Sequence, residues 1–160
     1  MTIKTGDTLP EGAFTQMGPN GPQKLKTAAL FGGKTVVLVS VPGAFTPTCD
    51  ARHLPGFVDH LAAIKAKGVD MVAFTAVNDV FVMNAWGKHA NVGDGILMLA
   101  DGNADYVKLL GLTLDGTGFG MGTRGQRFAL VVKDGVATQV LVEAPGEFKV
   151  SSAEHVLSVL

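Results

Sequence analysis

The sequence predicts a single α/β domain in which helices flank a central mixed β-sheet. Short apolar runs rich in β-branched residues, such as residues 36–41, alternate with segments whose apolar residues recur at helical spacing. The 160 residues are 47% hydrophobic and 17% charged, which favours one folded domain with a sizeable core. No internal repeat, low-complexity tract or linker divides the chain. We therefore take residues 1–160 as one domain.

The first half of the chain contains the clearest strand pattern and the longest helical pattern. Residues 3–15 are expected to form an N-terminal β-hairpin or an extended arm, followed by a turn-rich connection over 17–22. Residues 36–41 have the pattern of a buried strand. A helix is expected from about 47 to 67. Pro55 should kink this helix, so that its first turn can unwind on its own.

The second half continues the alternation of strands and helices. Asp134-Gly135 is a turn signal that folds residues 128–142 into a hairpin. Ser151, with Glu154 three residues later, has the capping-box signature of a final helix. The other expected elements are a strand over 69–77, a helix capped by Asn78 or Asp79, a strand over 96–99 and a helix over 104–110.

Cys49 is the one cysteine in the chain, and it lies where the 36–41 strand gives way to a helix. Thr46 is a good N-cap and Pro47 is tolerated at the first helical position, so Cys49 falls in the first turn. Free amides and the helix dipole favour a thiolate there. Asp50 opposes this by charge repulsion, so a nearby cation is needed. The alternatives are that Cys49 fills the core as a small hydrophobe and that Thr46 is only a cap.

These residues resemble the active-site pattern of the peroxiredoxins. The pattern is Pro42-x-x-x-Thr46-x-x-Cys49, and its extension through His53 to Phe57 is similar to the type-five subfamily, also called type II or atypical. The similarity continues along most of the chain, in segments at 6–10, 77–86, 99–102, 122–128 and 146–153. The resemblance implies a thioredoxin-like fold and thiol-dependent reduction of hydrogen peroxide and small organic hydroperoxides.

The resemblance also implies roles for individual residues. Cys49 is the peroxidatic nucleophile that becomes a sulfenic acid, Thr46 is its hydroxyl partner, and Pro42 shields the pocket. Arg124 matches the catalytic cation, and Arg127 is a second candidate three residues later. Fixed donors suit this chemistry, because charge moves from sulfur to a leaving oxygen as the O–O bond breaks. Without the resemblance, solvated surface charges would be the simpler interpretation of both arginines.

This chain has other residues at the positions where related proteins carry a resolving cysteine. Phe74 stands where plant type-II members have theirs, and Ser151-Ser152 stand where vertebrate type-five members have theirs. No disulfide can form within these residues, so an outside thiol must reduce the sulfenic acid. We expect glutathione, with or without a glutaredoxin, and thioredoxin as the second choice.

The glycine-rich segment over 116–122 lacks the lysine of a phosphate-binding loop, and we interpret it as a flexible loop that delivers Arg124. Phe119 and Met121 in this loop are candidates for the apolar wall of a substrate pocket, or for core or interface packing. His53 is a candidate base or a ligand for a glutathione carboxylate, with a partly exposed helix histidine as the alternative. The other histidines show no metal-site spacing, so neither a metal nor another cofactor is expected.

Charge and composition restrict the partners. The net charge is −1 and the basic residues are scattered, which argues against nucleic acid and anionic membranes. No signal core or long apolar run is present, and one unpaired cysteine fits a reducing compartment, so a cytoplasmic location is expected. The resemblance implies a homodimer, to which Phe45 and Phe81 could contribute. Other functions that use the same cysteine are a thiol–disulfide oxidoreductase, which the missing C-x-x-C disfavours, and a peroxide sensor, redox relay or holdase.

Overall fold

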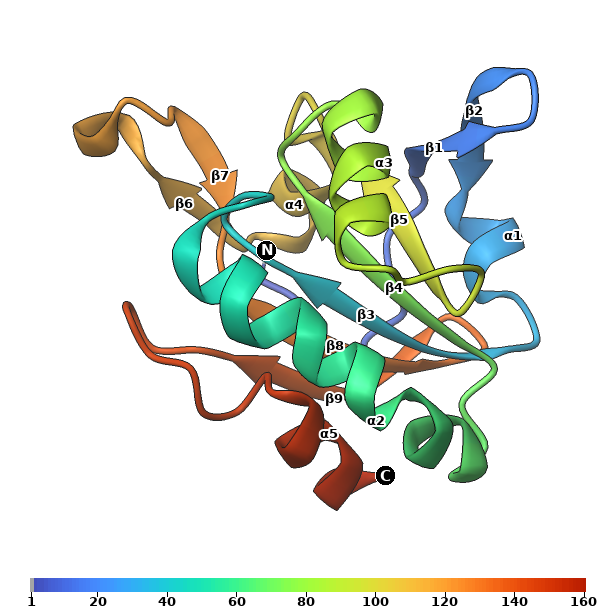
Figure 1. The fold of residues 1–160 in the computed structure, drawn as a ribbon. Helices are drawn as coiled ribbons and strands as arrows, with labels where there is room; N and C mark the ends of the chain where they lie inside the picture. Colours follow the sequence, from blue (N-terminus) through green and yellow to red (C-terminus); the bar gives the residue numbers. More distant parts are fainter. Residues whose placement is uncertain (1) are drawn as a thin grey trace.

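The computed structural model describes residues 2–160, and its centre is a seven-stranded mixed sheet with helices on both faces (Figure 1). The strand order is β2-β1-β5-β4-β3-β8-β9. The central strands β3, β4 and β5 are parallel, and the other pairs are antiparallel. The strands of this sheet are β1 (Ala13–Gly18), β2 (Gly21–Lys26), β3 (Thr35–Ser40), β4 (Met71–Ala76), β5 (Ile96–Ala100), β8 (Phe128–Lys133) and β9 (Val136–Val142). The predicted α/β class with a mixed sheet is confirmed.

Both faces of the sheet are covered, and this explains why the four inner residues of β3, residues 36–39, are all apolar. The helices are α1 (Thr27–Phe31), α2 (Leu54–Ala66), α3 (Val80–His89), α4 (Asp105–Leu110) and α5 (Ala153–Val159). Val37 and Val39 pack with α2, α3 and α5, whereas Val36 and Leu38 pack with α1 and α4 on the opposite face. A strand buried on both faces has a nearly continuous run of apolar side chains, because residues that point either way are buried. The predicted strand over 36–41 therefore matches β3 to within one residue at each end.

The N-terminal hairpin lies later in the chain than predicted. It is formed by β1 and β2, with Gly18 paired to Gly21, so only Pro19 and Asn20 make the turn. The expected N-terminal hairpin is present, but residues 3–12 precede it and lie outside the named strands, with one bridge from Thr8 to Val136, so the alternative of an arm fits them better. The turn expected over 17–22 is confined to residues 19 and 20, because the other four residues belong to the strands. Pro22 is tolerated in β2 because this strand lies at the edge of the sheet.

Two helix caps refine the sequence-based expectations. Asp79 caps α3 by accepting a hydrogen bond from the Val82 N–H at 2.9 Å. The cap of α5 is Ser152, whose hydroxyl accepts from the His155 N–H at 3.2 Å. The prediction that Ser151 caps this helix is wrong by one residue. The Ser151 hydroxyl instead donates to the carboxylate of Glu143 at 2.7 Å.

The segment between α4 and β8 contains a small hairpin, and the glycine-rich residues 116–122, expected to be a loop that leads to Arg124, connect its two strands. Strands β6 (Thr113–Asp115) and β7 (Thr123–Gly125) pair with each other, and the 3-10 turn η2 (Thr117–Phe119) lies at their tip. This hairpin projects from the main sheet (Figure 1). The glycines let its tip turn sharply, since Gly120 and Gly122 both have positive φ angles.

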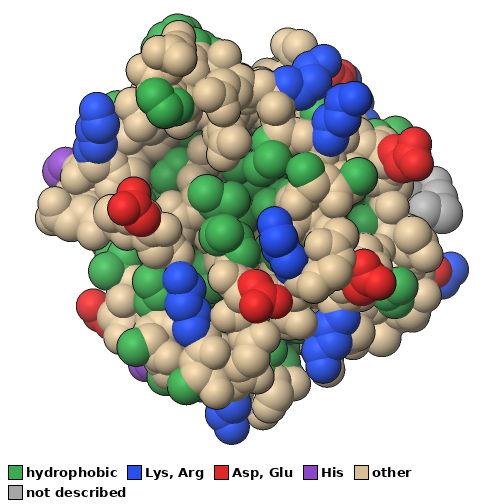
Figure 2. Space-filling model, turned by 90° about the vertical axis from the view of Figure 1, so that its right-hand side faces the viewer, with side chains coloured by type: hydrophobic (Ala, Val, Ile, Leu, Met, Phe, Trp, Pro, Cys, Tyr) green, Lys and Arg blue, Asp and Glu red, His purple; other side chains and the backbone are tan. Residues whose placement is uncertain are grey.

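A hollow lies on the face that carries the β1–β2 hairpin and α3. Figure 2 shows apolar side chains gathered in this hollow. A pocket of about 770 Å³ lies between β1, α3 and β5 there, and its lining includes Met17, Val92 and Met98. No residue of the loop between β3 and α2 lines it. Among residues 2–160, no helix has the length and apolar character needed to cross a membrane.

Candidate active site

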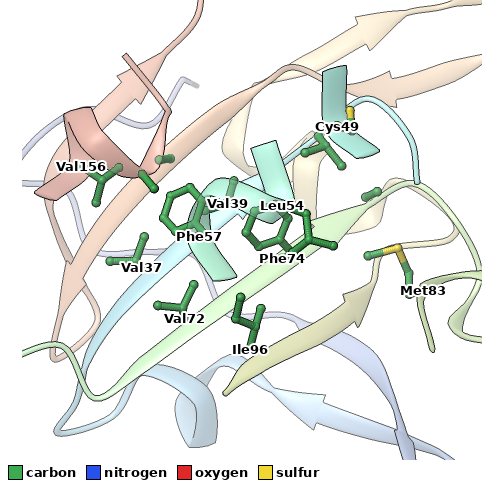
Figure 3. Packing of buried hydrophobic residues seen from close by; sticks show 14 of the residues in the cluster. Val37, Val39, Cys49, Leu54, Phe57, Val72, Phe74, Met83, Ile96 and Val156 are labelled. Atoms are coloured by element: carbon green, nitrogen blue, oxygen red, sulfur yellow. The ribbon is translucent and has the colours of Figure 1, made fainter. Parts of the chain in front are cut away.

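Cys49 lies where the chain leaves the end of β3 and begins its long helix. Residues 47–66 are helical, as predicted, and Cys49 is fully buried at the start of this helix. Figure 3 shows Cys49 at the margin of the apolar cluster that contains Leu54, Phe57 and Phe74. The sulfur therefore lies at the junction between the hydrophobic core and the loop that follows β3.

The helix around Cys49 has an irregular first part. Residues Cys49–His53 form a π-helical segment, η1, in which the Leu54 N–H donates to the Cys49 carbonyl oxygen five residues earlier. Pro55 follows in the first turn of α2 and has no N–H to donate to the carbonyl four residues before it. Single π-turns are rare and frequently occur at functional sites. This turn buries the side chains of both Cys49 and His53.

Two side chains hold the sulfur of Cys49. The Thr46 hydroxyl lies 2.9 Å from Sγ and 2.7 Å from the Gly43 carbonyl oxygen. Its single proton can be donated to only one of these acceptors at a time. The Arg127 Nη2–H donates to Sγ at 3.0 Å. The sulfur thus contacts the guanidinium of Arg127 and a hydroxyl whose proton can point either to the sulfur or to the Gly43 carbonyl oxygen.

The structure corrects the choice of arginine. Ser40 of β3 pairs with Phe128 of β8, so Arg127 lies level with the start of the loop that carries Cys49. Arg124 lies in the β6–β7 hairpin instead. Its Nε–H donates to the Met121 carbonyl oxygen at 2.9 Å, and its Nη1–H donates to the Pro42 carbonyl oxygen at 3.3 Å. The prediction that Arg124 supplies the cation at the sulfur is therefore wrong. Arg127 contacts the sulfur, and Arg124 braces the loop.

His53 is fully buried and is not the exposed helix histidine that the sequence left open. Its Nε2 lies 2.8 Å from the Ser151 carbonyl oxygen, which can only accept, so Nε2 carries the proton. Its Nδ1 then accepts from the Arg127 Nη1–H at 2.7 Å. Burial, aided by the positive charge of Arg127, lowers the pKa of His53 to about 3, although the contact with Ser151 and the charge of Glu143 act in the opposite direction. A neutral His53 holds Arg127 and does not act as a base near neutral pH.

This depressed pKa predicts a loss of stability in acid. Unfolded His53 takes up a proton below about pH 6.5, whereas folded His53 stays neutral until about pH 3. Buried His53 therefore costs no stability above about pH 6.5, and between these two values the free energy of unfolding falls by about 1.4 kcal/mol for each pH unit of acidification. Denaturant unfolding at several pH values should show a shallower dependence in His53→Asn than in the wild type. Equal slopes for the two proteins would contradict this prediction.

The other predicted residues lie at different distances from the sulfur. Pro42 lines a pocket of about 320 Å³ together with Thr48, Arg127 and Phe148. The Met121 methyl group approaches Gly43, so it borders the loop that carries Cys49. Phe119 is 87% exposed at the tip of the β6–β7 hairpin, so it is not part of the core, and of the alternatives this exposure favours interface packing.

Several residues near the site had no predicted role. The Trp86 Nε1–H donates to the Asp50 carboxylate at 2.9 Å, and this bond fixes the acid next to Cys49 in sequence. The Phe148 ring lies 4.9 Å from the His53 ring and 5.9 Å from the Arg127 guanidinium carbon. Glu143 holds the segment that carries Ser151. The sequence contained one usable signal, since Gly146-Glu147-Phe148 belongs to the pattern that the resemblance rests on.

This arrangement suits nucleophilic chemistry at sulfur. A thiolate at Cys49 is stabilised by the guanidinium of Arg127, and both Arg127 and Thr46 can donate to an oxygen bound beside it. Within residues 2–160, no group of three or more His, Cys, Asp or Glu side chains could hold a metal ion.

Comparisons with known proteins show which family and which structures the chain is similar to. The family model described as Redoxin matches residues 4–157. Peroxiredoxin-2B of Arabidopsis thaliana is 45% identical over 161 residues, covering 99% of this chain and 98% of that protein. The solved structure of reduced Prx3 in complex with H2O2 from Vibrio vulnificus is 49% identical, with a TM-score of 0.95 over 99% of both chains. The Plasmodium falciparum antioxidant protein, a 1-Cys peroxiredoxin, is 26% identical, with a TM-score of 0.90 over 98% of both chains.

Proposed function

Since the chain belongs to the redoxin family, and within it to the type-five or type II peroxiredoxins, we propose that this thiol peroxidase uses Cys49 as its peroxidatic residue and is reduced by a thiol of another molecule. The general activity, reduction of peroxides by a thiol, follows from membership of the family. The observation that carries the assignment of the site is the buried sulfur of Cys49, held between Thr46 Oγ1 at 2.9 Å and Arg127 Nη2 at 3.0 Å.

The proposed first step is the attack of the Cys49 thiolate on one oxygen of a peroxide. An S–O bond forms and the O–O bond breaks, so the cysteine becomes a sulfenic acid and the second oxygen leaves as water or an alcohol after taking up a proton. Arg127 stabilises the charge that moves towards the leaving oxygen. The Thr46 hydroxyl can transfer its hydrogen bond from the Gly43 carbonyl to the sulfur or the peroxide, because both acceptors lie within reach. This geometry supports hydrogen peroxide and small organic hydroperoxides as substrates.

The reductant is proposed to be glutathione, with or without a glutaredoxin, and thioredoxin is the second choice. The support is the presence of one cysteine in these 160 residues. Phe74 is fully buried in the core and Ser151 is fully buried in the segment that follows β9, and neither residue is a thiol. The sulfenic acid must therefore form a mixed disulfide with an outside thiol. The pocket of about 320 Å³ beside Arg127 is a suitable place for that thiol to enter.

Reduction also requires the buried sulfur to become accessible. We propose that the π-helical turn of Cys49–His53 unwinds while α2 stays folded, with Pro55 as the boundary between them. The π-turn interrupts the regular α-helical hydrogen bonding and borders Pro55, which cannot donate, so we expect it to unwind before the rest of the helix.

Intact-mass measurements test both halves of the cycle. One equivalent of hydrogen peroxide should add one oxygen to the wild-type chain, and glutathione should then replace it with a glutathione adduct. Cys49→Ser should show neither change. Steady turnover is expected with glutathione plus glutaredoxin, and robust turnover with thioredoxin alone would overturn that ranking. Oxidation without turnover by any thiol would favour a peroxide sensor instead.

Assembly and location are also proposals. Phe45 is 46% exposed and Phe81 is 65% exposed, and they lie beside and on α3. Large exposed aromatic side chains are typical of interfaces, which supports a homodimer through this surface. Sedimentation equilibrium would measure its mass. A reducing compartment such as the cytoplasm would supply the thiols that the cycle needs.

A further inference from the structure

The carboxylate of Glu143 is a buried anchor for the segment that follows β9. Glu143 is 7% exposed, and its Oε2 accepts from the Ser151 N–H at 2.8 Å and from the Ser151 hydroxyl at 2.7 Å. The Lys149 N–H lies 2.8 and 2.9 Å from its two oxygens. Burial acts to raise the pKa of Glu143, but these hydrogen bonds outweigh burial and lower that pKa. In the described part of the chain no lysine or arginine pairs with Glu143, so its charge is satisfied by residues 149–151.

The anchored segment sets the protonation of His53. The Ser151 carbonyl oxygen accepts from His53 Nε2–H at 2.8 Å, which leaves Nδ1 as an acceptor. That acceptor receives the Arg127 Nη1–H at 2.7 Å. Because a guanidinium is rigid and planar, fixing Nη1 also fixes the direction of Nη2, which donates to the Cys49 sulfur at 3.0 Å.

We propose that Glu143 and His53 are positioning residues for the peroxidase reaction, acting through Ser151 to aim Arg127 at the Cys49 sulfur. This proposal rests on the proposed function. It assigns a role to the segment that occupies one of the positions where a resolving cysteine is missing. In place of a second thiol, the Ser151 backbone supplies one link of a hydrogen-bonded chain from Glu143 to Cys49.

A neutral imidazole is well suited to this task. A carboxylate in direct contact with Arg127 would hold it equally well but would cancel much of its charge. His53 fixes the guanidinium without a counter-charge, and the negative charge of Glu143 is kept two hydrogen-bonded groups away. The same segment places the Phe148 ring against both His53 and the guanidinium of Arg127. Arg127 therefore keeps its positive charge for the sulfur and for an incoming peroxide.

A matched pair of substitutions at His53 separates positioning from simple damage. His53→Asn keeps an acceptor near the place of Nδ1 but loses the donor to Ser151, whereas His53→Gln keeps a donor near the place of Nε2 but loses the acceptor for Arg127. Two rates would be measured for each protein, the reaction with hydrogen peroxide and the alkylation of Cys49 by uncharged iodoacetamide. Only the peroxide reaction needs Arg127 aimed at a breaking O–O bond. Trp86 is the one tryptophan and contacts Asp50, so its fluorescence can follow the oxidation.

The ratio of the peroxide rate to the alkylation rate should fall by about 10-fold to 100-fold in His53→Gln, because one charge-assisted hydrogen bond is lost, and by only a few-fold in His53→Asn. In Glu143→Gln the same ratio should fall by a few-fold, as in His53→Asn, since the amide cannot accept every donor that the carboxylate accepts and the effect reaches Arg127 only through Ser151 and His53. Glu11→Gln, at an exposed glutamate, serves as the control and should match the wild type.

Equal ratios in His53→Gln and His53→Asn, or a Glu143→Gln ratio equal to that of Glu11→Gln, would overturn the proposal. If His53→Gln does not fold, the comparison of Glu143→Gln with Glu11→Gln decides the matter. A wild-type chain that does not react with peroxide would refute the proposed function and this proposal with it. If the wild-type chain reacts with peroxide but the variants all show the same ratio of rates, only the present proposal is refuted and the proposed function stands.

Discussion

Arg127→Gln should slow the reaction of Cys49 with hydrogen peroxide by about 100-fold to 1000-fold, the usual cost of removing one preorganised donor from a charge-stabilising site. Arg127 contacts the sulfur at 3.0 Å, and in the proposed mechanism it stabilises charge on the leaving oxygen. Arg124→Gln should slow the same reaction by about 10-fold or less, because its contact is with the Pro42 carbonyl oxygen. Rapid mixing with peroxide, followed by Trp86 fluorescence, would measure both rates.

Arg127→Lys is the control for this experiment. A lysine keeps the charge but has no rigid fork, so it cannot contact His53 and the sulfur together in the same way. Its rate should lie between those of the wild type and Arg127→Gln. The assignment would fail if Arg124→Gln were the slower variant, since the sequence-based choice of Arg124 would then be restored.

The contrast between these arginines shows which parts of the site can be predicted from sequence. The contact between Thr46 and Cys49 spans three residues, and the resemblance, which rests on this short motif, was enough to predict it. The contact between Arg127 and Cys49 spans 78 residues and depends on the pairing of Ser40 with Phe128. Sequence spacing alone does not reveal that register, and the arginine chosen from the resemblance lay three residues too early.

The fold shows the same division between local and long-range information. Strand β3 was predicted because its burial on both faces forces an unbroken apolar run, and the β8–β9 turn because Asp134 and Gly135 both adopt positive φ. The cap of α5 was misplaced because Glu143, a residue outside the local pattern, takes the hydroxyl of Ser151. The π-turn at Cys49 was not predicted either, although Pro55 correctly marked the helix as irregular there.

Phe74 connects the fold to the site. It is fully buried on β4, and its ring lies 5.3 Å from that of Phe57, 5.5 Å from that of His53 and 6.1 Å from that of Trp86. Figure 3 shows Phe74 next to Phe57 in the middle of the apolar cluster. The residue that occupies the position of a plant-type resolving cysteine is therefore a central part of the core, and it supports one side of His53.

Phe74→Ala should lower the free energy of unfolding by about 3–5 kcal/mol, the usual cost of truncating a buried phenylalanine. Phe74→Leu leaves most of the volume filled and should cost about 1–2 kcal/mol. Denaturant unfolding followed by circular dichroism would measure both values. Because the cavity in Phe74→Ala borders His53, we also expect slower peroxide reduction in that variant under conditions where it remains folded. A loss of less than 1 kcal/mol in Phe74→Ala, which is well below the usual range for such a truncation, would contradict the central role of Phe74 in the core.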